Sequence, residues 1–138
     1  MTPADLAAYA LAELASREKH YPAMIAEGAI EAAAAEADLA AWRGIEAITR
    51  FSAERKPGGY RENPRLATTA VAGEGATWDE MVAATSRALD RQRRRDPASG
   101  RCAAVQALHD HVVDRRWFWT GDAAPRPALP AEPLSEAA

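Results

Sequence analysis

A run of arginines is the feature of this sequence with the clearest capacity for chemistry. Six of them lie between residues 87 and 101: Arg87, Arg91, Arg93, Arg94, Arg95 and Arg101. Only Asp90 and Asp96 oppose them there, which leaves a local surplus of four positive charges. Forked guanidinium groups bind phosphate or carboxylate oxygens, but arginines at a helix C-terminus are also favoured by the helix dipole alone. The run therefore fits either an anion-binding surface or a solvated helix end.

A second candidate surface is the aromatic group Trp117, Phe118 and Trp119, which follows Arg115 and Arg116. Successive positions of a helix point in different directions, so the three rings cannot all face one core. Tryptophan and arginine dominate the energetics of protein interfaces. Trp117, Trp119 and both arginines are therefore predicted to contact a partner, and the alternative is that the rings close the core.

The remaining polar residues do not form a recognisable catalytic or metal-binding motif. His109 and His111 are two positions apart on an expected helix, so they point away from each other and cannot chelate one ion together. Zinc-protease, EF-hand, phosphate-loop and serine-elbow patterns do not occur. Cys102 has no evident base beside it and is predicted to be a small core residue. We expect no enzyme, metal or cofactor, although scattered residues brought together by folding could still form a site.

Length and composition predict one small helical domain. The chain has 138 residues, of which 48% are hydrophobic, many of them alanine, and its net charge is −3. Alanine favours helices that approach one another closely. A single cysteine excludes an internal disulfide framework and indicates a reducing, cytoplasmic compartment. A basic leader segment and a membrane-length apolar run are both lacking in the sequence, so no membrane partner is expected.

The first half of the chain is predicted to be a helical hairpin over residues 1–51. Thr2, Pro3 and Asp5 form a capping pattern for a helix over 3–20, which should end at Tyr21-Pro22. A second helix is expected over 29–50. Its apolar stripe contains six residues: Ile30, Ala34, Ala37, Ala41, Ile45 and Ile48. Trp42 lies beside this stripe, and it too is a candidate partner contact.

The second half is predicted to be another hairpin over residues 77–122, packed on the first as one domain. Thr77 and Glu80 form a capping box for a helix over 77–95, and Ser99 can cap a fourth helix over 100–118. Proline and glycine make 52–76 a long loop, within which 68–71 is at most a brief strand. Residues 123–138 read as a disordered tail. The expected fold is all-α, with two helical hairpins.

Residues 17–30, followed by Ala37, Trp42, Ile45 and Ile48, resemble small, uncharacterised helical proteins of phages and prophages. In that group an arginine-rich helix meets Tyr-Pro, and a glycine then precedes an alanine-rich second helix. Tyr21-Pro22, Gly28, Ala37 and Ile48 carry the match, which covers about the first fifty residues. The resemblance implies a phage-associated helical module and carries over no catalytic residue.

These observations predict a non-catalytic, phage-type or accessory protein that acts by binding another macromolecule, for instance as an inhibitor of a host defence complex. The predicted contacts are nine residues: Trp42, Arg91, Arg93, Arg94, Arg95, Arg115, Arg116, Trp117 and Trp119. A protein partner is expected first, and homo-oligomers could form through the alanine-rich face of 29–50. One alternative is a nucleic-acid-binding regulator that uses the arginines of 87–101. The other is a nucleotide-sequestering oligomer or small enzyme.

Overall fold

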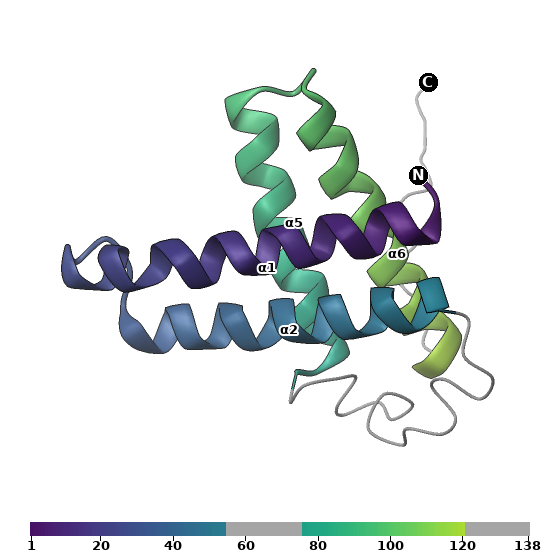
Figure 1. The fold of residues 1–138 in the computed structure, drawn as a ribbon, viewed down its shortest axis with the longest axis horizontal. Helices are drawn as coiled ribbons and strands as arrows, with labels where there is room; N and C mark the ends of the chain where they lie inside the picture. The colour runs from purple at the N-terminus through teal and green to yellow at the C-terminus, as the bar shows by residue number, and fades with distance from the viewer. Residues whose placement is uncertain (55–75, 121–138) are drawn as a thin grey trace, which may run out of the picture.

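The described part of the protein consists of two crossed helical hairpins (Figure 1). The structure is a computed structural model that describes residues 1–54 and 76–120, with side chains up to Trp117. It contains helices α1 (Pro3–Ala26), α2 (Ala32–Glu54), α5 (Trp78–Arg95) and α6 (Gly100–Thr120). Helix α1 packs against α2, and α5 packs against α6. The predicted all-α fold with two hairpins is therefore confirmed.

Helix α1 begins as expected but continues past its proline. The Thr2 and Asp5 side chains form the capping box, with Pro3 in the first turn. The expected end at Tyr21-Pro22 is wrong, because Pro22 lies inside the helix and the helix ends at Ala26. A tertiary contact holds this turn, since the Tyr21 hydroxyl donates to Asp38 Oδ2 of α2 at 2.5 Å. Gly28, with φ of 77°, ends the segment in the left-handed conformation that glycine adopts readily.

Helix α2 runs from Ala32 to Glu54, three residues later at its start and four later at its end than predicted. Its buried face includes Ala41, Ile45 and Ile48 of the expected stripe. Ala34 and Ala37 are exposed instead, so the stripe does not extend into the first turns of the helix. The reason is that the second hairpin packs across the later turns of α2 only (Figure 1).

The second hairpin has the capping residues that the sequence indicated. The Thr77 and Glu80 side chains each bond the other's backbone N–H at the start of α5. Ser99 Oγ accepts the backbone N–H of Cys102 at 3.0 Å at the start of α6. None of the described helices combines the length and apolar character needed to cross a bilayer.

All four helices contribute to one core. Its largest fully buried side chains are Trp42, Trp78, Ile45, Ile48 and Met81. Cys102 is buried with them, as predicted. The predicted strand at 68–71, most of the predicted 52–76 loop and the predicted 123–138 tail lie outside the described residues.

Candidate anion-binding cleft

Two charged side chains interrupt the buried face of α1. Glu13 and Arg17 lie one turn apart, and only 5% and 8% of their surfaces are exposed. Arg17 Nη1 contacts Glu13 Oε1 at 2.5 Å, and Arg17 Nε contacts Asp38 Oδ2 of α2 at 3.2 Å. The guanidinium carbon lies 4.1 Å from the centroid of the Trp42 ring. Two carboxylates and an aromatic face therefore compensate the buried arginine.

This buried arginine is the centre of a network that reaches all four helices. From α5, Arg87 Nη2 contacts Asp38 Oδ1 at 3.1 Å. From α6, Arg101 Nη2 contacts Glu13 Oε2 at 3.0 Å. The two carboxylates are thus each shared between Arg17 and an arginine of the second hairpin. The network fixes the orientation of Arg101, because its guanidinium group is held from one side by Glu13.

The network also shifts the pKa values of its acidic groups. Burial alone would raise the pKa of Glu13, but the hydrogen bond from Arg17 and the charges of Arg17 and Arg101 outweigh it and lower that pKa. Burial raises the pKa of the Tyr21 hydroxyl, and the hydrogen bond with Asp38 raises it further. Glu13 is consequently ionised, and Tyr21 keeps its proton, across the physiological pH range.

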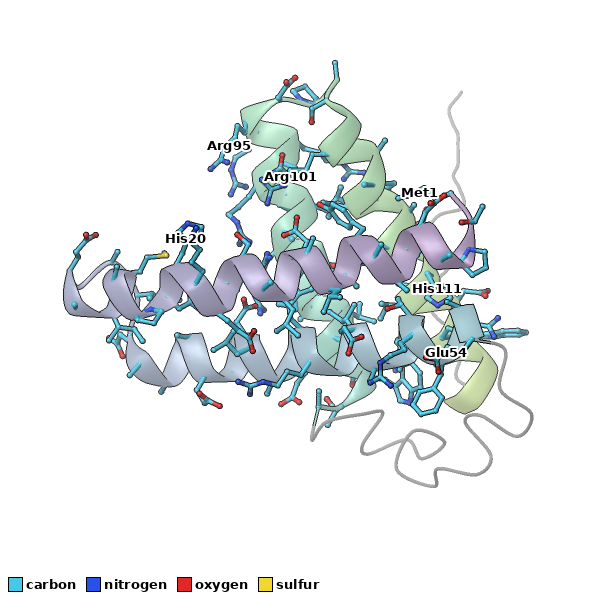
Figure 2. The ribbon with its side chains drawn as sticks, in the orientation of Figure 1. Met1, His20, Glu54, Arg95, Arg101 and His111 are labelled. Carbon is cyan, nitrogen blue, oxygen red and sulfur yellow. The ribbon has the colours of Figure 1, made fainter. Side chains whose placement is uncertain are left out.

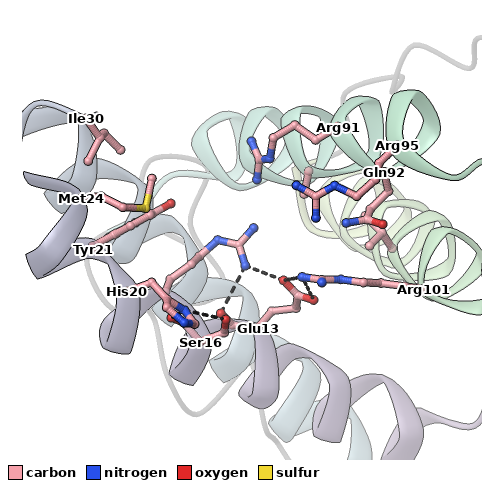
Figure 3. A pocket seen from close by; sticks show the side chains of 13 residues that line it. Glu13, Ser16, His20, Tyr21, Met24, Ile30, Arg91, Gln92, Arg95 and Arg101 are labelled. Carbon is pink, nitrogen blue, oxygen red and sulfur yellow. Dashed lines mark hydrogen bonds and ion pairs between the residues drawn. The ribbon is translucent and has the colours of Figure 1, made fainter. Parts of the chain in front are cut away.

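A cleft of about 420 Å³ opens beside this network, between the second half of α1 and the loop end of the α5–α6 hairpin. Figure 3 shows Arg91 and Arg95 of α5 and Arg101 of α6 on one side of it. Tyr21 and Met24 of α1 lie on the other side. Arg91 and Arg95 are exposed and four positions apart, so they lie on the same side of α5.

The cleft has an excess of positive charge. Four guanidinium groups line it, those of Arg17, Arg91, Arg95 and Arg101, against the single carboxylate of Glu13. This leaves a surplus of three charges, or two when Asp38 behind Arg17 is counted. A second hollow of about 400 Å³ between α1 and α2 differs, because its Arg43 is within 4.0 Å of both Glu18 and Glu36. The α1–α5–α6 cleft is therefore the better candidate for binding an anion.

Only part of the predicted arginine surface faces this cleft. Arg91 and Arg95 line it, whereas Arg93 donates to Gln106 Oε1 of α6 at 2.5 Å. Arg94 is exposed and does not line the cleft. The helical period explains the split, because Arg93 is two positions from both Arg91 and Arg95, and Arg94 is one position from Arg95, and side chains at these spacings project in different directions. The structure adds Arg101, which lies near Arg95 at the loop end of the hairpin (Figure 2).

The other predicted contacts lie at the opposite end of the second hairpin. Arg116 Nε contacts Asp79 Oδ1 at the start of α5 at 2.9 Å, and Arg115 Nη2 contacts Asp114 Oδ2 at 2.8 Å. The Trp117 side chain is 42% exposed, while the side chain of Trp119 lies outside the described residues. Antiparallel packing separates these residues from Arg91 and Arg95 by most of the length of α5, or about 18–24 Å. The arginines of residues 87–101 and those at 115 and 116 therefore do not form one continuous surface.

Trp42 requires a correction. It was predicted to contact a partner, but it is 0% exposed and lies in the core beneath Arg17. The Trp42 ring is buried because the second hairpin packs over that side of α2. In this structure Trp42 has no surface available to a partner.

Sequence reasoning missed the charged residues Glu13, Arg17 and Asp38. It also missed the residues of α1 that line the cleft, such as Tyr21 and Met24. A signal for two of them was present. Glu13 and Arg17 stand at helical spacing from Leu6, Ala10 and Leu14, inside an otherwise apolar face. Charged residues at buried positions are rare unless they are paired, so this interruption could have indicated a buried ion pair. The further partners of this ion pair, Asp38 and Arg101, come from other helices, and the sequence does not indicate them.

No protein-family model matches the chain, and none of the curated proteins or solved structures compared with it matches either. The candidate site is therefore argued from its own geometry. Within residues 1–54 and 76–117, no group of three or more His, Cys, Asp or Glu side chains is arranged to hold a metal ion.

Proposed function

We propose that the protein is a non-catalytic binding protein that captures an anionic group of its partner in the cleft between α1, α5 and α6. One observation carries this proposal. Arg91 and Arg95 line the cleft and are exposed, and neither forms an ion pair with any acidic side chain in the described ranges. Guanidinium groups that are left without a counter-charge at a concave surface are suited to bind carboxylate or phosphate.

The macromolecular form of the proposal is a partner protein that inserts an acidic segment into the cleft. An inhibitor of a host defence complex would work in this way, because it needs a tight contact and no chemistry. Nucleic acid is the weaker candidate. Backbone recognition needs cations that follow a strand, and Arg115 and Arg116 lie far from the cleft beside acidic neighbours.

A catalytic role for the cleft receives little support from its one serine–histidine pair. His20 Nδ1 lies 2.8 Å from the Ser16 carbonyl oxygen and 3.3 Å from Ser16 Oγ. The shorter contact requires Nδ1 to carry the proton, and a protonated nitrogen cannot accept one from the hydroxyl. His20 in this arrangement does not activate Ser16 as a nucleophile.

A charge-reversal pull-down tests the proposal. The double variant Arg91→Glu/Arg95→Glu should lose proteins that the wild-type chain enriches from a host lysate at low salt. Arg93→Glu/Arg94→Glu is the matched control, since it makes the same change in charge on the same helix but outside the cleft. Partners that remain on the cleft variant and disappear from the control would refute the proposal.

Homo-oligomer formation through the alanine-rich face of α2 stays a prediction. Ala33, Ala34 and Ala37 are exposed on this face in the single chain. Light scattering on the purified protein measures the molar mass directly. A mass of one chain at micromolar concentration would contradict this prediction without affecting the proposal for the cleft.

A further inference from the structure

We infer that the cleft binds a free nucleotide of the nucleoside diphosphate class, with the phosphates at Arg91, Arg95 and Arg101 and the nucleoside toward Met24 and Ile30. The inference rests on the proposed anion-capturing function and specifies the ligand. It differs from a nucleotide site formed between protomers, because every residue that it uses belongs to one chain.

The charge of the cleft matches a diphosphate better than a carboxylate. The lining has a surplus of two to three positive charges. An acidic side chain supplies one negative charge, whereas a terminal diphosphate supplies about three near neutral pH. Each phosphate oxygen can accept a charge-assisted hydrogen bond, and three guanidinium groups offer donors from two helices. A single carboxylate would leave part of this charge uncompensated, so an acidic segment would need to place two or three carboxylates in the cleft to match it.

One of the three arginines is already oriented. Arg101 is held by Glu13 at 3.0 Å, and Glu13 is in turn held by the buried Arg17. A side chain that is fixed before binding loses less conformational entropy when the ligand arrives. Arg91 and Arg95 have no such restraint and can adjust to the second phosphate.

The opposite side of the cleft includes two apolar side chains beside the polar Tyr21 and His20. Met24 and Ile30, which are both partly exposed, face it from the end of α1 and the turn that follows. Figure 3 shows them across the cleft from Arg101. A simple anion would leave these side chains unused, whereas a nucleoside would cover them. The volume of about 420 Å³ falls within the usual range for small-molecule sites, which is about 300–1,000 Å³.

Calorimetry on the full chain with four probes tests the inference: ADP, adenosine, pyrophosphate and a hexaglutamate peptide. We expect ADP to bind most tightly, pyrophosphate more weakly and adenosine not measurably. Arg91→Gln/Arg95→Gln should weaken ADP binding at least about tenfold, because two charge-assisted contacts are lost. The matched control Arg93→Gln/Arg94→Gln should change the Kd for ADP by less than about twofold from the wild-type value, since those side chains lie outside the cleft.

A second variant probes the apolar side without changing charge. Met24→Ala should weaken ADP about three- to tenfold, since buried apolar contact is lost, and should leave pyrophosphate binding unchanged. Met24 lies outside the core cluster, so this variant should fold, which circular dichroism checks.

The outcomes separate the inference from the proposed function. If hexaglutamate binds through Arg91 and Arg95 while ADP does not, the nucleotide inference is wrong and the anion-capturing function stands. Pyrophosphate binding as tightly as ADP would also overturn the inference, because the nucleoside would contribute nothing. If neither ADP, pyrophosphate nor the peptide binds, both proposals fail.

Discussion

Arg17 shows how a buried charge can be accommodated in a small helical core. Its guanidinium group meets Glu13, Asp38 and the face of Trp42, and only 8% of the residue is exposed. Burial of a charge costs several kcal/mol unless partners compensate it. Removing a single member therefore leaves the others partly uncompensated, and the penalty should exceed that of losing a surface ion pair.

Arg17→Met should lower the free energy of unfolding by about 2–4 kcal/mol, because Glu13 and Asp38 would each lose one buried partner. Both carboxylates keep a second arginine, Arg101 or Arg87, which limits the loss. Urea unfolding followed by circular dichroism measures the change. The control Arg94→Met, at an exposed site, should change stability by less than about 0.5 kcal/mol. Equal effects of the two substitutions would contradict this account of Arg17.

The lowered pKa of Glu13 predicts how stability depends on pH. A carboxyl group whose pKa is lower in the folded state than its ordinary value of 4.5 stabilises the fold above that value. This contribution is lost as the pH falls from about 4.5 through the folded-state pKa. The wild type should be more stable than Glu13→Gln at pH 7, and the difference should narrow below pH 4.5. Parallel stability profiles for the two proteins from pH 7 to pH 3 would refute the role of the ionised carboxylate.

At the scale of single helices, α1 differs most from what its local sequence predicts, because it continues past a proline. Proline inside a helix lacks the N–H that would bond the carbonyl of the residue four positions earlier, and its ring clashes with that carbonyl. Helix α1 nevertheless continues from Tyr21 through Pro22 to Ala26, and the Tyr21–Asp38 hydrogen bond attaches this turn to α2. The energy of tertiary contacts therefore outweighs the local cost of the proline.

Pro22→Ala should raise the thermal midpoint of unfolding. The exposed alanine restores one backbone hydrogen bond and removes the clash with the Glu18 carbonyl, a gain of about 1–3 kcal/mol. Differential scanning calorimetry measures the shift. Ala15→Pro, at another exposed position of the same helix, is the counterpart and should destabilise the protein by about 3 kcal/mol or more. A lower midpoint for Pro22→Ala would indicate that the proline is needed to shape the turn.

On the scale of the whole molecule, the two hairpins meet through both an apolar core and ion pairs. Trp42 and Ile45 of α2 and Met81 of α5 are fully buried in a shared cluster. The ion pairs Arg87–Asp38 and Arg101–Glu13 join the hairpins at the edge of this core. Both arginines are at least half exposed, so solvent screens these pairs. The apolar core should therefore hold the hairpins together.

Two substitutions compare these contributions. Ile45→Ala should cost about 2–5 kcal/mol of unfolding free energy, because it removes buried volume at a residue that is 0% exposed. Arg101→Gln should cost no more than about 1 kcal/mol, since its guanidinium is half exposed. Chemical denaturation of both variants gives the comparison. If the arginine variant proved the less stable of the two, ion pairing would be the main link between the hairpins.

The sequence alone determined most of the secondary structure. Capping residues and helical periodicity act over a few positions, so the start of α1, all of α5 and the start of α6 could be predicted to within about a residue. The burial of Cys102 was also predicted, because no neighbouring residue gives this thiol a chemical role. The arginine run was also visible as a concentration of charge.

Only the tertiary structure decided which of these residues act together. Packing of the second hairpin across α2 buried Trp42, and contacts with α2 carried α1 through Pro22. The antiparallel course of α5 and α6 placed Arg116 beside Asp79, far from Arg91. The cleft itself combines side chains of α1, α5 and α6, which are up to 88 positions apart in the case of Glu13 and Arg101. Local propensity contains no information on such pairings, because their energy arises only when distant helices are packed together.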